Sequence, residues 1–362
     1  MVTSTDQFDR LRLIRSPNIG PVTYRQLITR FGSAAAALQA LPDLATRGGG
    51  KAALADPKAI ENEIAASRYL DAHYLFVGDH DYPDLLAQLD NAPPVFIYRG
   101  NLELLSRNPV AMVGARNASA GACQFARTLA FELAEASLAV VSGLARGIDT
   151  AAHRGSINGG TIAVIAGGID FVYPPENREL QDLIAERGLL IAEMPPGTEP
   201  RARHFPYRNR IIAGLALGTV VIEAAPKSGS LITARLAAEA GREVMAIPGS
   251  PLDPRSHGCN QLIREGATLV QNAADIVELL GPIDHRAVRD PVSEPSAIAP
   301  IEDGGEADRR SVIDLMGMTY VSVDELVRQS GASQAVTQMV LLELELAGKL
   351  ERGAGGKVRL IS

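Results

Sequence analysis

Positively charged side chains stand directly before an apolar, helix-like stretch in the segment HFPYRNRIIAG, residues 204–214. Two aromatic residues and a polar triplet precede the apolar part: Phe205, Tyr207, Arg208, Asn209 and Arg210. Guanidinium groups at the start of a helix interact unfavourably with the helix dipole, by roughly 0.3 kcal/mol or more, unless an anion lies between them. The segment therefore predicts a bound anion, and ion pairs with Glu193 or Glu199 are the structural alternative.

A second candidate anion site lies in the segment MVGARNAS, where an apolar run ends. Gly114 allows a ligand to approach the backbone, Arg116 offers several N–H donors, and Ser119 can cap the following helix. An arginine beside a helix N-terminus favours a bound anion, because the free N–H groups and the helix dipole act together there. The structural alternative is a capped loop with a solvated arginine.

Four further loops combine cations, glycines and hydroxyl groups. Their residues of interest are Lys227, Ser228, Gly229 and Ser230 in EAAPKSGSLITA, Ser142 and Gly143 in SGLARGIDTAAH, Arg178 in YPPENREL, and Arg255 in IPGSPLDPRSHG. Such groups before a helix can surround a phosphate with donors. Each loop alone is a weak signal, so the prediction depends on whether the fold brings the loops together.

Short apolar runs separate these loops between residues 80 and 280. They read PVAMVG, LAVVSG, TIAVIAGG, LLIAE, GTVVIEA, EVMAIPG and ATLVQ, without polar alternation. Such runs are typical of strands buried on both faces, which predicts an α/β fold with an extended Rossmann-like parallel sheet and helices on both faces. Ligands bind beyond the carboxyl ends of parallel strands, where these loops fall. We therefore expect Arg116, Arg178, Arg208, Arg210 and Lys227 along one edge of the sheet, with Arg255 as an additional candidate.

Several enzyme classes lack their motifs in this chain. A dinucleotide site requires G-x-G-x-x-G and a P-loop requires G-x-x-x-x-G-K-[ST], and neither occurs. The trio Ser142, Asp149 and His153 suggests a hydrolase, but the G-x-S-x-G elbow is missing. We expect Asp149 to cap a helix and His153 to be a packed, hydrogen-bonded residue. No cysteine and histidine pair has zinc spacing, so no metal is expected.

Length and composition indicate a multi-domain protein of the cytoplasm. The 362 residues suit two or three domains, and 46% hydrophobic with 21% charged residues is ordinary for a globular chain. Cys123 and Cys259 predict reduced thiols, and neither a signal peptide nor a membrane span is expected. The net charge of −7 argues weakly against nucleic acid, although binding responds to local patches of charge.

The chain divides into four predicted segments. Residues 1–75 have helical spacing around a Pro-Asn-Ile-Gly-Pro turn, resembling a helix-hairpin-helix or SAM-like domain; a helical bundle without a ligand is the alternative. Residues 79–280 form the Rossmann-like core, and residues 281–307, rich in proline, glycine and acids, form a linker. Residues 308–362 contain three helical stretches and a strand pair, in the order of a winged helix.

The third helical stretch of this winged-helix-like domain is acidic. In other winged helices this helix often enters the groove of duplex DNA. Here it carries Glu343 and Glu345 and no cation before Lys349, so contact with phosphates would be repulsive. We therefore favour packing or protein contact over DNA contact for this domain.

Several phosphate-binding loops along one crevice suit a ligand with repeated phosphates, because a single phosphate needs only one loop. Single-stranded nucleic acid fits, since a basic groove can follow its backbone while a few aromatic side chains contact bases. The chain has no Trp and few other aromatic residues. We therefore expect recognition of backbone and strandedness and not of base sequence.

The blocks VGAR, SGLARGIDTAAH, AVIAGGIDFVYPPEN, FPYRNRIIAGL and EAAPKSGSLITA…GREVMAIPG resemble, in this order, those of the DprA/Smf family of DNA-processing proteins. The segment DYPDLLAQLDNAPPVFIYRG before them is similar to the family's lead-in. The resemblance implies a protein that binds single-stranded DNA, forms a homodimer and loads the RecA recombinase during natural transformation. It also implies no catalytic activity and no cofactor.

The resemblance implies a DNA-binding site drawn from five blocks. Its residues would be Gly114, Arg116, Ser142, Gly143, Arg178, Arg208, Asn209, Arg210, Lys227, Ser228, Gly229 and Ser230. Many relatives carry a lysine in the YPPENREL block, where either Pro175 or Arg178 takes that position here. The alternative function is a nucleotide-processing hydrolase that uses the same crevice with Glu223 as acid and base, although the block P-G-G-x-G-T-x-x-E is missing.

Overall fold

The computed structural model describes residues 4–51, 53–281, 305–353 and 356–361. The chain forms two compact units. The larger unit is Asn62–Asp284, and the smaller unit combines Met1–Glu61 with His285–Ser362. The predicted linker, residues 281–307, lies outside the described residues except at its two ends.

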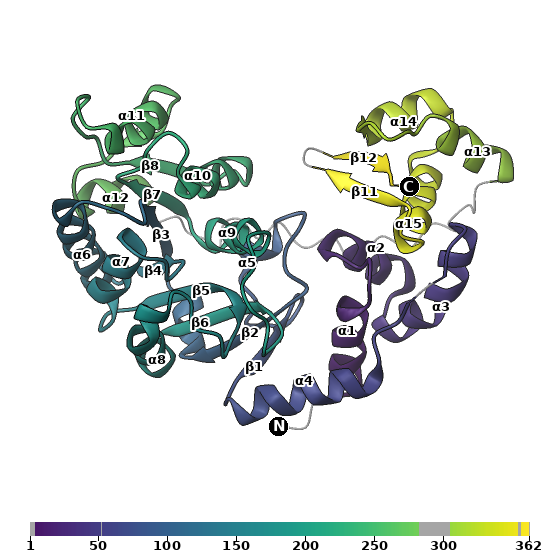
Figure 1. Cartoon of the computed structure of the whole chain (residues 1–362), viewed down its shortest axis with the longest axis horizontal. Helices are drawn as coiled ribbons and strands as arrows, with labels where there is room; N and C mark the ends of the chain where they lie inside the picture. The colour runs from purple at the N-terminus through teal and green to yellow at the C-terminus, as the bar shows by residue number, and fades with distance from the viewer. Residues whose placement is uncertain (1–3, 52, 282–304, 354–355, 362) are drawn as a thin grey trace. The chain divides into compact units, whose positions relative to one another are not determined.

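Within the described residues, nine strands form one sheet in the larger unit (Figure 1). They are β1 His73–Phe76, β2 Val95–Gly100, β3 Pro109–Gly114, β4 Ala139–Ser142, β5 Thr161–Gly168, β6 Leu189–Met194, β7 Gly218–Ile222, β8 Glu243–Ala246 and β9 Thr268–Leu269. Their order across the sheet is β1-β2-β6-β5-β4-β3-β7-β8-β9. All neighbours from β6 to β9 are parallel, as the apolar runs predict.

Two strands at one edge of this sheet are additional to the predicted ones. β2 pairs antiparallel with β6, and β1 pairs antiparallel with β2. The strand β1 is only four residues long and begins with exposed His73 and half-buried Tyr74, so it offers no long apolar run that would identify it from sequence. The sheet is therefore parallel with an antiparallel edge.

Helices cover both faces of the sheet. They are α5 Asp84–Ala87, α6 Ala120–Glu135, α7 Ile148–Ser156, α8 Arg178–Arg187, α9 His204–Leu215, α10 Gly229–Glu239, α11 His257–Arg264 and α12 Ala273–Leu280, with 3-10 turns η1 Leu102–Ser106, η2 Pro175–Asn177 and η3 Pro254–Ser256. In β3, Val110 and Met112 pack with α6, α7 and α12, whereas Ala111 and Val113 pack with α9, α10 and α11. This alternation places β3 at the centre of two apolar layers.

The smaller unit is built from both ends of the chain. Its N-terminal part contains α1 Thr5–Arg15, α2 Pro21–Phe31, α3 Ala34–Arg47 and the start of α4 Pro57–Tyr69. Its C-terminal part contains α13 Glu306–Asp314, β10 Val321–Ser322, α14 Val323–Ser330, α15 Gln334–Leu346, β11 Leu350–Gly353 and β12 Lys357–Leu360. The predicted order of three helices and a strand pair is confirmed.

Helix boundaries in the smaller unit follow local sequence signals. Pro21 begins α2 after Gly20, and Gly32 ends it in the left-handed conformation, with φ 73°. The turn between α1 and α2 places Asn18 at φ 63°, a conformation that asparagine tolerates better than most residues. This arrangement is the predicted helical hairpin.

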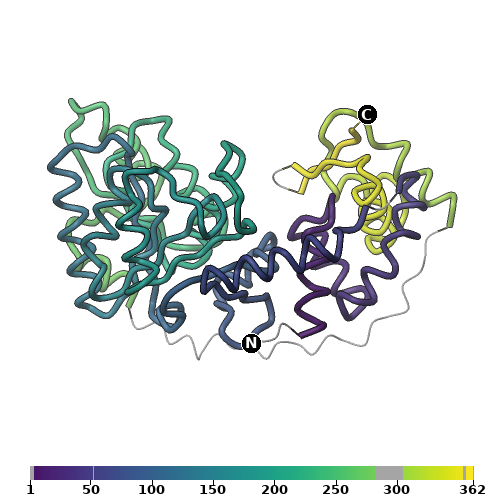
Figure 2. The backbone as a smooth tube through the Cα atoms, turned by 60° about the horizontal axis from the view of Figure 1, so that its bottom comes forward, coloured from purple at the N-terminus to yellow at the C-terminus, as the bar shows by residue number. Residues whose placement is uncertain are grey.

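Helix α15 packs against α3, so the two ends of the chain share one interface (Figures 1 and 2). The Glu343 side chain is fully buried, and it forms ion pairs with Arg309 at 2.5 Å and with Arg47 at 3.9 Å. A β-carbon on Gly48 would lie 2.1 Å from the Glu343 carbonyl oxygen. The acidic helix is therefore used for packing in this unit, which is the role favoured from its sequence.

Three further features of the described residues are the state of the cysteines, the length of the helices and the grouping of metal-binding side chains. Cys123 and Cys259 are both free thiols. Among the described helices, none has the length and apolar character that crossing a bilayer requires. The described part of the chain contains no cluster of three metal-binding side chains.

Candidate functional site

The ring of Phe205, in the first turn of α9, lies at the centre of a small cluster. The guanidinium carbon of Arg116 is 5.1 Å from the ring centre, and that of Arg208 is 6.0 Å away. The ring of Tyr173 meets the same ring edge-on at a centroid distance of 5.7 Å. Cations attract the face of an aromatic ring, so these contacts connect the loop after β3, the loop after β5 and α9.

A small pocket opens beside this cluster, at the carboxyl ends of β4 and β5. It is lined by Gly143, Ala145, Ile165, Ala166, Gly167, Phe171, Tyr173, Pro200, Phe205 and Arg208. Most of these residues are apolar, and the guanidinium of Arg208 is the charged group among them. An apolar wall with one cation suits a ligand that carries both a flat ring and a negative charge.

Arg208 is buried, with 6% of its surface exposed. Its Nη1 donates to the Val164 carbonyl oxygen at 3.1 Å, and its Nε has no hydrogen-bond partner in the part of the chain that the structure describes. Burial lowers the pKa of Arg208 to about 10, an effect that nearby Asp149 opposes. A β-carbon on Gly143 would lie 1.4 Å from Nη1 of Arg208, so only glycine at position 143 leaves room for this guanidinium.

The carboxylate of Asp149 holds the loop after β4 through hydrogen bonds to its backbone. It accepts hydrogen bonds from the amides of Gly143 at 3.2 Å and Ala145 at 3.3 Å. Burial raises the pKa of Asp149, and the charge of Arg208 acts in the opposite direction. The prediction that Asp149 is the N-cap of its helix is wrong, because Gly147 takes that position and Asp149 instead binds the preceding loop.

Arg210 lies away from the pocket. Its side chain is buried and forms an ion pair with Glu193 at 2.5 Å. For this residue the structure therefore supports the alternative of an ion pair. Asn209, between the two arginines, is half-buried.

The loop after β3 carries Arg116 on the surface. Ser119 caps α6 by accepting a hydrogen bond from the amide of Ala122 at 3.1 Å, as predicted. Gly114 allows close packing within the sheet, since a β-carbon there would lie 2.0 Å from the Ile222 carbonyl oxygen. The prediction that it leaves the backbone open to a ligand is therefore not supported. Arg116 is exposed and forms no ion pair with any other described residue.

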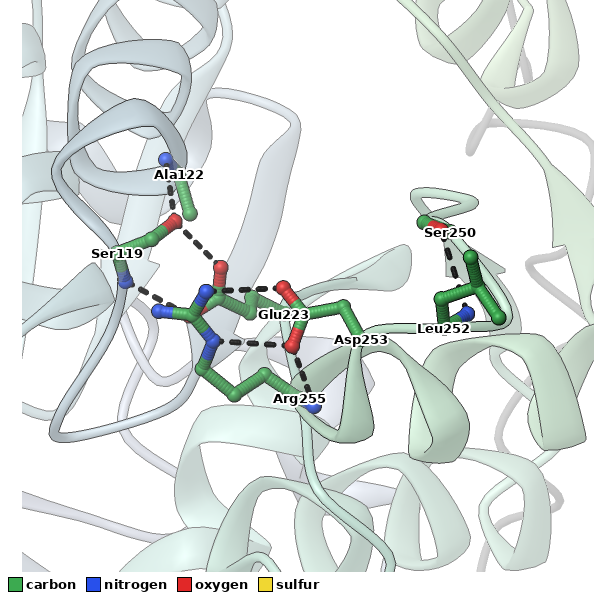
Figure 3. A network of polar contacts seen from close by, with 7 residues as sticks. All are labelled: Ser119, Ala122, Glu223, Ser250, Leu252, Asp253 and Arg255. Carbon is green, nitrogen blue, oxygen red and sulfur yellow. Dashed lines mark hydrogen bonds and ion pairs between the residues drawn. The ribbon is translucent and has the colours of Figure 1, made fainter.

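The remaining predicted cations fall into two groups. Lys227 and Arg178 are exposed and form no ion pair with other described residues, and Arg178 is the first residue of α8. Arg255 is occupied by Asp253, with Nη2 donating to the carboxylate at 2.9 Å (Figure 3). Arg255 is therefore a weaker candidate than the other two for contact with an anion.

The loop before α10 places its hydroxyl groups at the helix N-terminus. Ser228 is the N-cap, and its hydroxyl lies 2.7 Å from that of Ser230 and accepts from the Ser230 amide at 3.4 Å. Gly229 is exposed, with open space where a β-carbon would be. Beside Lys227, this loop offers polar groups at a helix N-terminus.

The residues of the suggested hydrolase trio have separate structural roles. Ser142 donates its hydroxyl hydrogen to the Met112 carbonyl oxygen at 2.6 Å. His153 is fully buried, with Nδ1 2.7 Å from the Thr161 hydroxyl oxygen, which confirms its predicted packing role. Burial lowers the pKa of His153 to about 3, so this histidine is neutral near pH 7.

Sequence reasoning missed several residues at the pocket. Its walls include Phe171 and Tyr173 from the loop after β5 and Pro200 from the proline-rich loop after β6. Arg201 and Arg203 are exposed directly before α9, next to Pro200. The signal in the sequence is the run PRARHF, in which two arginines stand immediately before His204.

Comparisons with known proteins identify all three parts of the chain. The family described as DNA recombination-mediator protein A matches residues 73–281. A DprA-like N-terminal HHH domain matches residues 4–66, and a DprA winged helix domain matches residues 294–356. The core match spans more than half of the chain.

Individual relatives agree with these matches. The chain is 49% identical over 201 residues to the DNA processing protein DprA of Streptococcus pneumoniae, covering 55% of this chain and 71% of the relative. An X-ray structure of DprA from that organism has a TM-score of 0.65 at 36% identity, covering 77% of this chain and 98% of the other.

A second solved structure concerns the single-stranded DNA binding mode of DNA processing protein A from Helicobacter pylori. It has a TM-score of 0.53 at 29% identity, and it covers 58% of this chain and 95% of the other. Together with the family match over the core, these likenesses show that the chain belongs to the DNA recombination-mediator protein A (DprA) family.

Proposed function

We propose that the larger unit binds single-stranded DNA across the pocket at the carboxyl ends of β4 and β5. The observation that carries this proposal is the cluster of Arg116, Phe205 and Arg208 around an apolar pocket. A relative from Helicobacter pylori is described by its single-stranded DNA binding mode, which supports the same ligand here.

Each group in the cluster has a defined part in this proposal. The exposed guanidinium of Arg116 contacts a phosphate, and the rings of Phe205 and Tyr173 offer apolar surface to a base. Arg208 lies deeper and donates from Nε, which has no hydrogen-bond partner among the described residues. Burial of this donor without a partner is unfavourable, so a ligand oxygen at the pocket would gain a strong hydrogen bond.

Further phosphates of the strand contact the neighbouring loops. Arg178 and Lys227 are exposed cations without an ion pair among the described residues, and Ser228, Gly229 and Ser230 supply polar groups beside Lys227. Ser142 and Gly143 act indirectly, because they shape the loop against which Arg208 lies. We assign Asn209 and Arg210 to the placement of α9, since Arg210 is held by Glu193.

The cellular role follows from family membership as a proposal. We infer a non-enzymatic mediator in the cytoplasm that loads RecA onto single-stranded DNA during transformation and acts as a homodimer without a cofactor. Exposed apolar side chains support a protein-contact surface in the larger unit, including Leu252 and, in the edge strand β9, Leu269. A RecA-dependent strand-exchange assay and light scattering of the purified protein test these two assignments.

Fluorescence anisotropy with single- and double-stranded oligonucleotides at several salt concentrations tests the DNA-binding proposal. We expect preference for single strands and a slope of log affinity against log salt of about 0.7 for each phosphate contacted. Arg116→Glu should abolish measurable binding because it places a negative charge beside the phosphate. Arg187→Glu is the matched control, since Arg187 is exposed at the end of α8, directly before the amino end of β6.

The proposal fails if Arg116→Glu binds as the wild type does, or if binding does not depend on salt. Thermal unfolding of both variants must stay close to that of the wild type, which excludes loss of the fold as the cause. Equal loss of affinity in both variants would indicate a general effect of net charge and would also contradict the proposed site.

A further inference from the structure

The strand order of the large sheet reverses between β3 and β7. Along the chain, β4, β5 and β6 extend the sheet on one side of β3, and β7, β8 and β9 extend it on the other. In doubly wound folds the ligand binds at this reversal, with a phosphate on the N-terminus of the helix after the first strand. In this chain that helix is α6, which begins at Ala120.

A carboxylate of the protein itself lies at the N-terminus of α6. Oε1 of Glu223 accepts a hydrogen bond from the Ser119 amide at 2.7 Å, and Oε2 accepts from the Ser119 hydroxyl at 2.6 Å (Figure 3). The same hydroxyl accepts from the amide of Ala122 in the first turn. Glu223 thereby makes contacts that a ligand phosphate makes at this position in dinucleotide-binding folds.

The backbone of Glu223 is also unusual. Its φ is 50°, in the left-handed region that is unfavourable for a residue with a side chain, typically by about 1–3 kcal/mol. Its carbonyl oxygen accepts a hydrogen bond from the amide of Ala115 at 2.8 Å. One residue after β7 therefore binds both ends of the loop from Ala115 to Ser119, and this loop carries Arg116.

The start of α7 holds the other side of the same loop. The amide of Ile148 donates to the Ala115 carbonyl oxygen at 3.3 Å. Gly147 has φ 74°, and a β-carbon there would lie 2.2 Å from that oxygen and 2.9 Å from the Arg116 carbonyl oxygen. The loop is thus clamped between Glu223 and Gly147, and the Arg116 side chain extends from it to the ring of Phe205.

We propose that Glu223 is a positioning residue for the DNA site. Its carboxylate replaces a ligand phosphate at the strand-order reversal and fixes the loop that presents Arg116. The ligand pocket is consequently displaced from the β3–β7 crevice to the ends of β4 and β5. The part of this inference that concerns affinity rests on the proposed DNA contact of Arg116.

Glu223→Gly is the sharpest variant, because glycine adopts φ 50° without strain while the carboxylate is removed. We expect single-stranded DNA affinity to fall about tenfold, the effect of losing one charge-assisted contact. The decrease should match that of Arg116→Ala, and the double variant should bind no more weakly than Arg116→Ala alone. Ser137→Gly is the matched control, since exposed Ser137 also has a positive φ, 65°.

The direction of the change in DNA affinity distinguishes a positioning role of Glu223 from a purely electrostatic effect of its negative charge. If Glu223 were only a negative charge near the DNA, its removal would increase affinity, and that result would overturn the proposal. Glu223→Gln keeps an acceptor for the Ser119 amide and should retain most of the affinity. Equal loss in the Gln and Gly variants would also contradict a role based on the hydrogen bonds to Ser119.

Hydrogen exchange of the free protein tests the loop without DNA. In Glu223→Gly, amide exchange across residues 115–122 should become faster, while exchange in α8 stays unchanged. Unchanged exchange in the loop would overturn the positioning role. If Arg116→Ala binds DNA normally but this loop still becomes mobile in Glu223→Gly, the proposed DNA contact of Arg116 fails and the positioning role of Glu223 stands.

Discussion

At the scale of single residues, the guanidinium of Arg208 lies against the backbone of Gly143. The Val164 carbonyl oxygen fixes one of its nitrogens, and the nearby carboxylate of Asp149 offsets part of the unfavourable burial. The Nε atom of the same buried side chain finds no hydrogen-bond partner among the residues described. A cation held in this way loses little conformational entropy when it binds an anion. Because the guanidinium occupies the space where a β-carbon of residue 143 would be, this arrangement depends on Gly143.

Gly143→Ala should displace Arg208 from the pocket, because the added β-carbon would lie 1.4 Å from Nη1. We expect a stability loss of about 1–3 kcal/mol from overpacking, together with weaker binding of single-stranded DNA. Denaturant unfolding and anisotropy measure the two effects. Gly121→Ala is the control, since open space surrounds that position in α6; equal effects in both variants would contradict the prediction.

Stability should fall in acid because of His153. Burial lowers its folded pKa to about 3 from the ordinary value of 6.5, so unfolding takes up a proton at intermediate pH. The stabilisation by neutral His153 is therefore complete above pH 6.5 and is lost as the pH falls towards 3. Between pH 7 and pH 5 this residue should cost about 2 kcal/mol of unfolding free energy.

Urea unfolding of wild type and His153→Asn at pH 7 and pH 5 measures this contribution. Asparagine can replace the hydrogen bond to Thr161 without titrating. The difference between the two proteins should therefore shrink by about 2 kcal/mol at the lower pH. A constant difference across this range would show that His153 does not contribute to the pH dependence.

At the scale of elements, α9 combines two functions within its first two turns. Phe205 and Arg208 lie at the pocket, and Arg210 fixes the helix to Glu193 at the end of β6. A buried ion pair contributes little net stability compared with an apolar pair, but loss of one partner leaves an isolated buried charge. The pair therefore controls how α9 sits on the sheet.

Arg210→Met should destabilise the larger unit by about 3–5 kcal/mol, because Glu193 keeps its charge without this partner. Adding Glu193→Gln should recover part of the loss. Single-stranded DNA affinity of the folded Arg210→Met protein, measured well below its melting temperature, should change less than threefold. A large loss of affinity without destabilisation would instead indicate that Arg210 contacts DNA.

The strands were predictable from sequence to a greater extent than the pocket. Long apolar runs such as TIAVIAGG have few alternatives to a buried strand, whereas the four residues of β1 have only partial burial. The contact between Arg116 and Phe205 depends on how distant segments pack, and no local pattern encodes it. From the sequence, Arg208 and Arg210 are equally good candidates for contact with an anion. Only the packing of α9 shows that Arg208 lies at the pocket and that Arg210 forms an ion pair with Glu193.

At the scale of the whole molecule, the smaller unit is discontinuous in sequence. Residues from both ends of the chain form it, and α15 packs against α3. The close approach of Gly48 and Gly50 to the backbone of α15 at Glu343 and Ala347 requires residues without side chains. The interface therefore tolerates little change in volume at these two glycines.

Gly48→Ala should lower the melting temperature of the smaller unit and leave that of the larger unit unchanged. The added β-carbon would lie 2.1 Å from the Glu343 carbonyl oxygen, and such overpacking costs about 1–3 kcal/mol. Calorimetry that resolves the two transitions is the appropriate measurement. Gly20→Ala is the control, because open space surrounds Gly20; a shift of both transitions in Gly48→Ala would contradict the division into units.

The discontinuous unit has a consequence for synthesis on the ribosome. Translation completes residues 62–284 before the segment that contains α15 emerges, so the central unit can fold while the first helices still lack their partner. The surface of α3 that α15 covers then remains exposed throughout the synthesis of more than half of the polypeptide. Nascent chains of this protein should therefore depend on chaperone protection at their N-terminal helices until the last domain has been made.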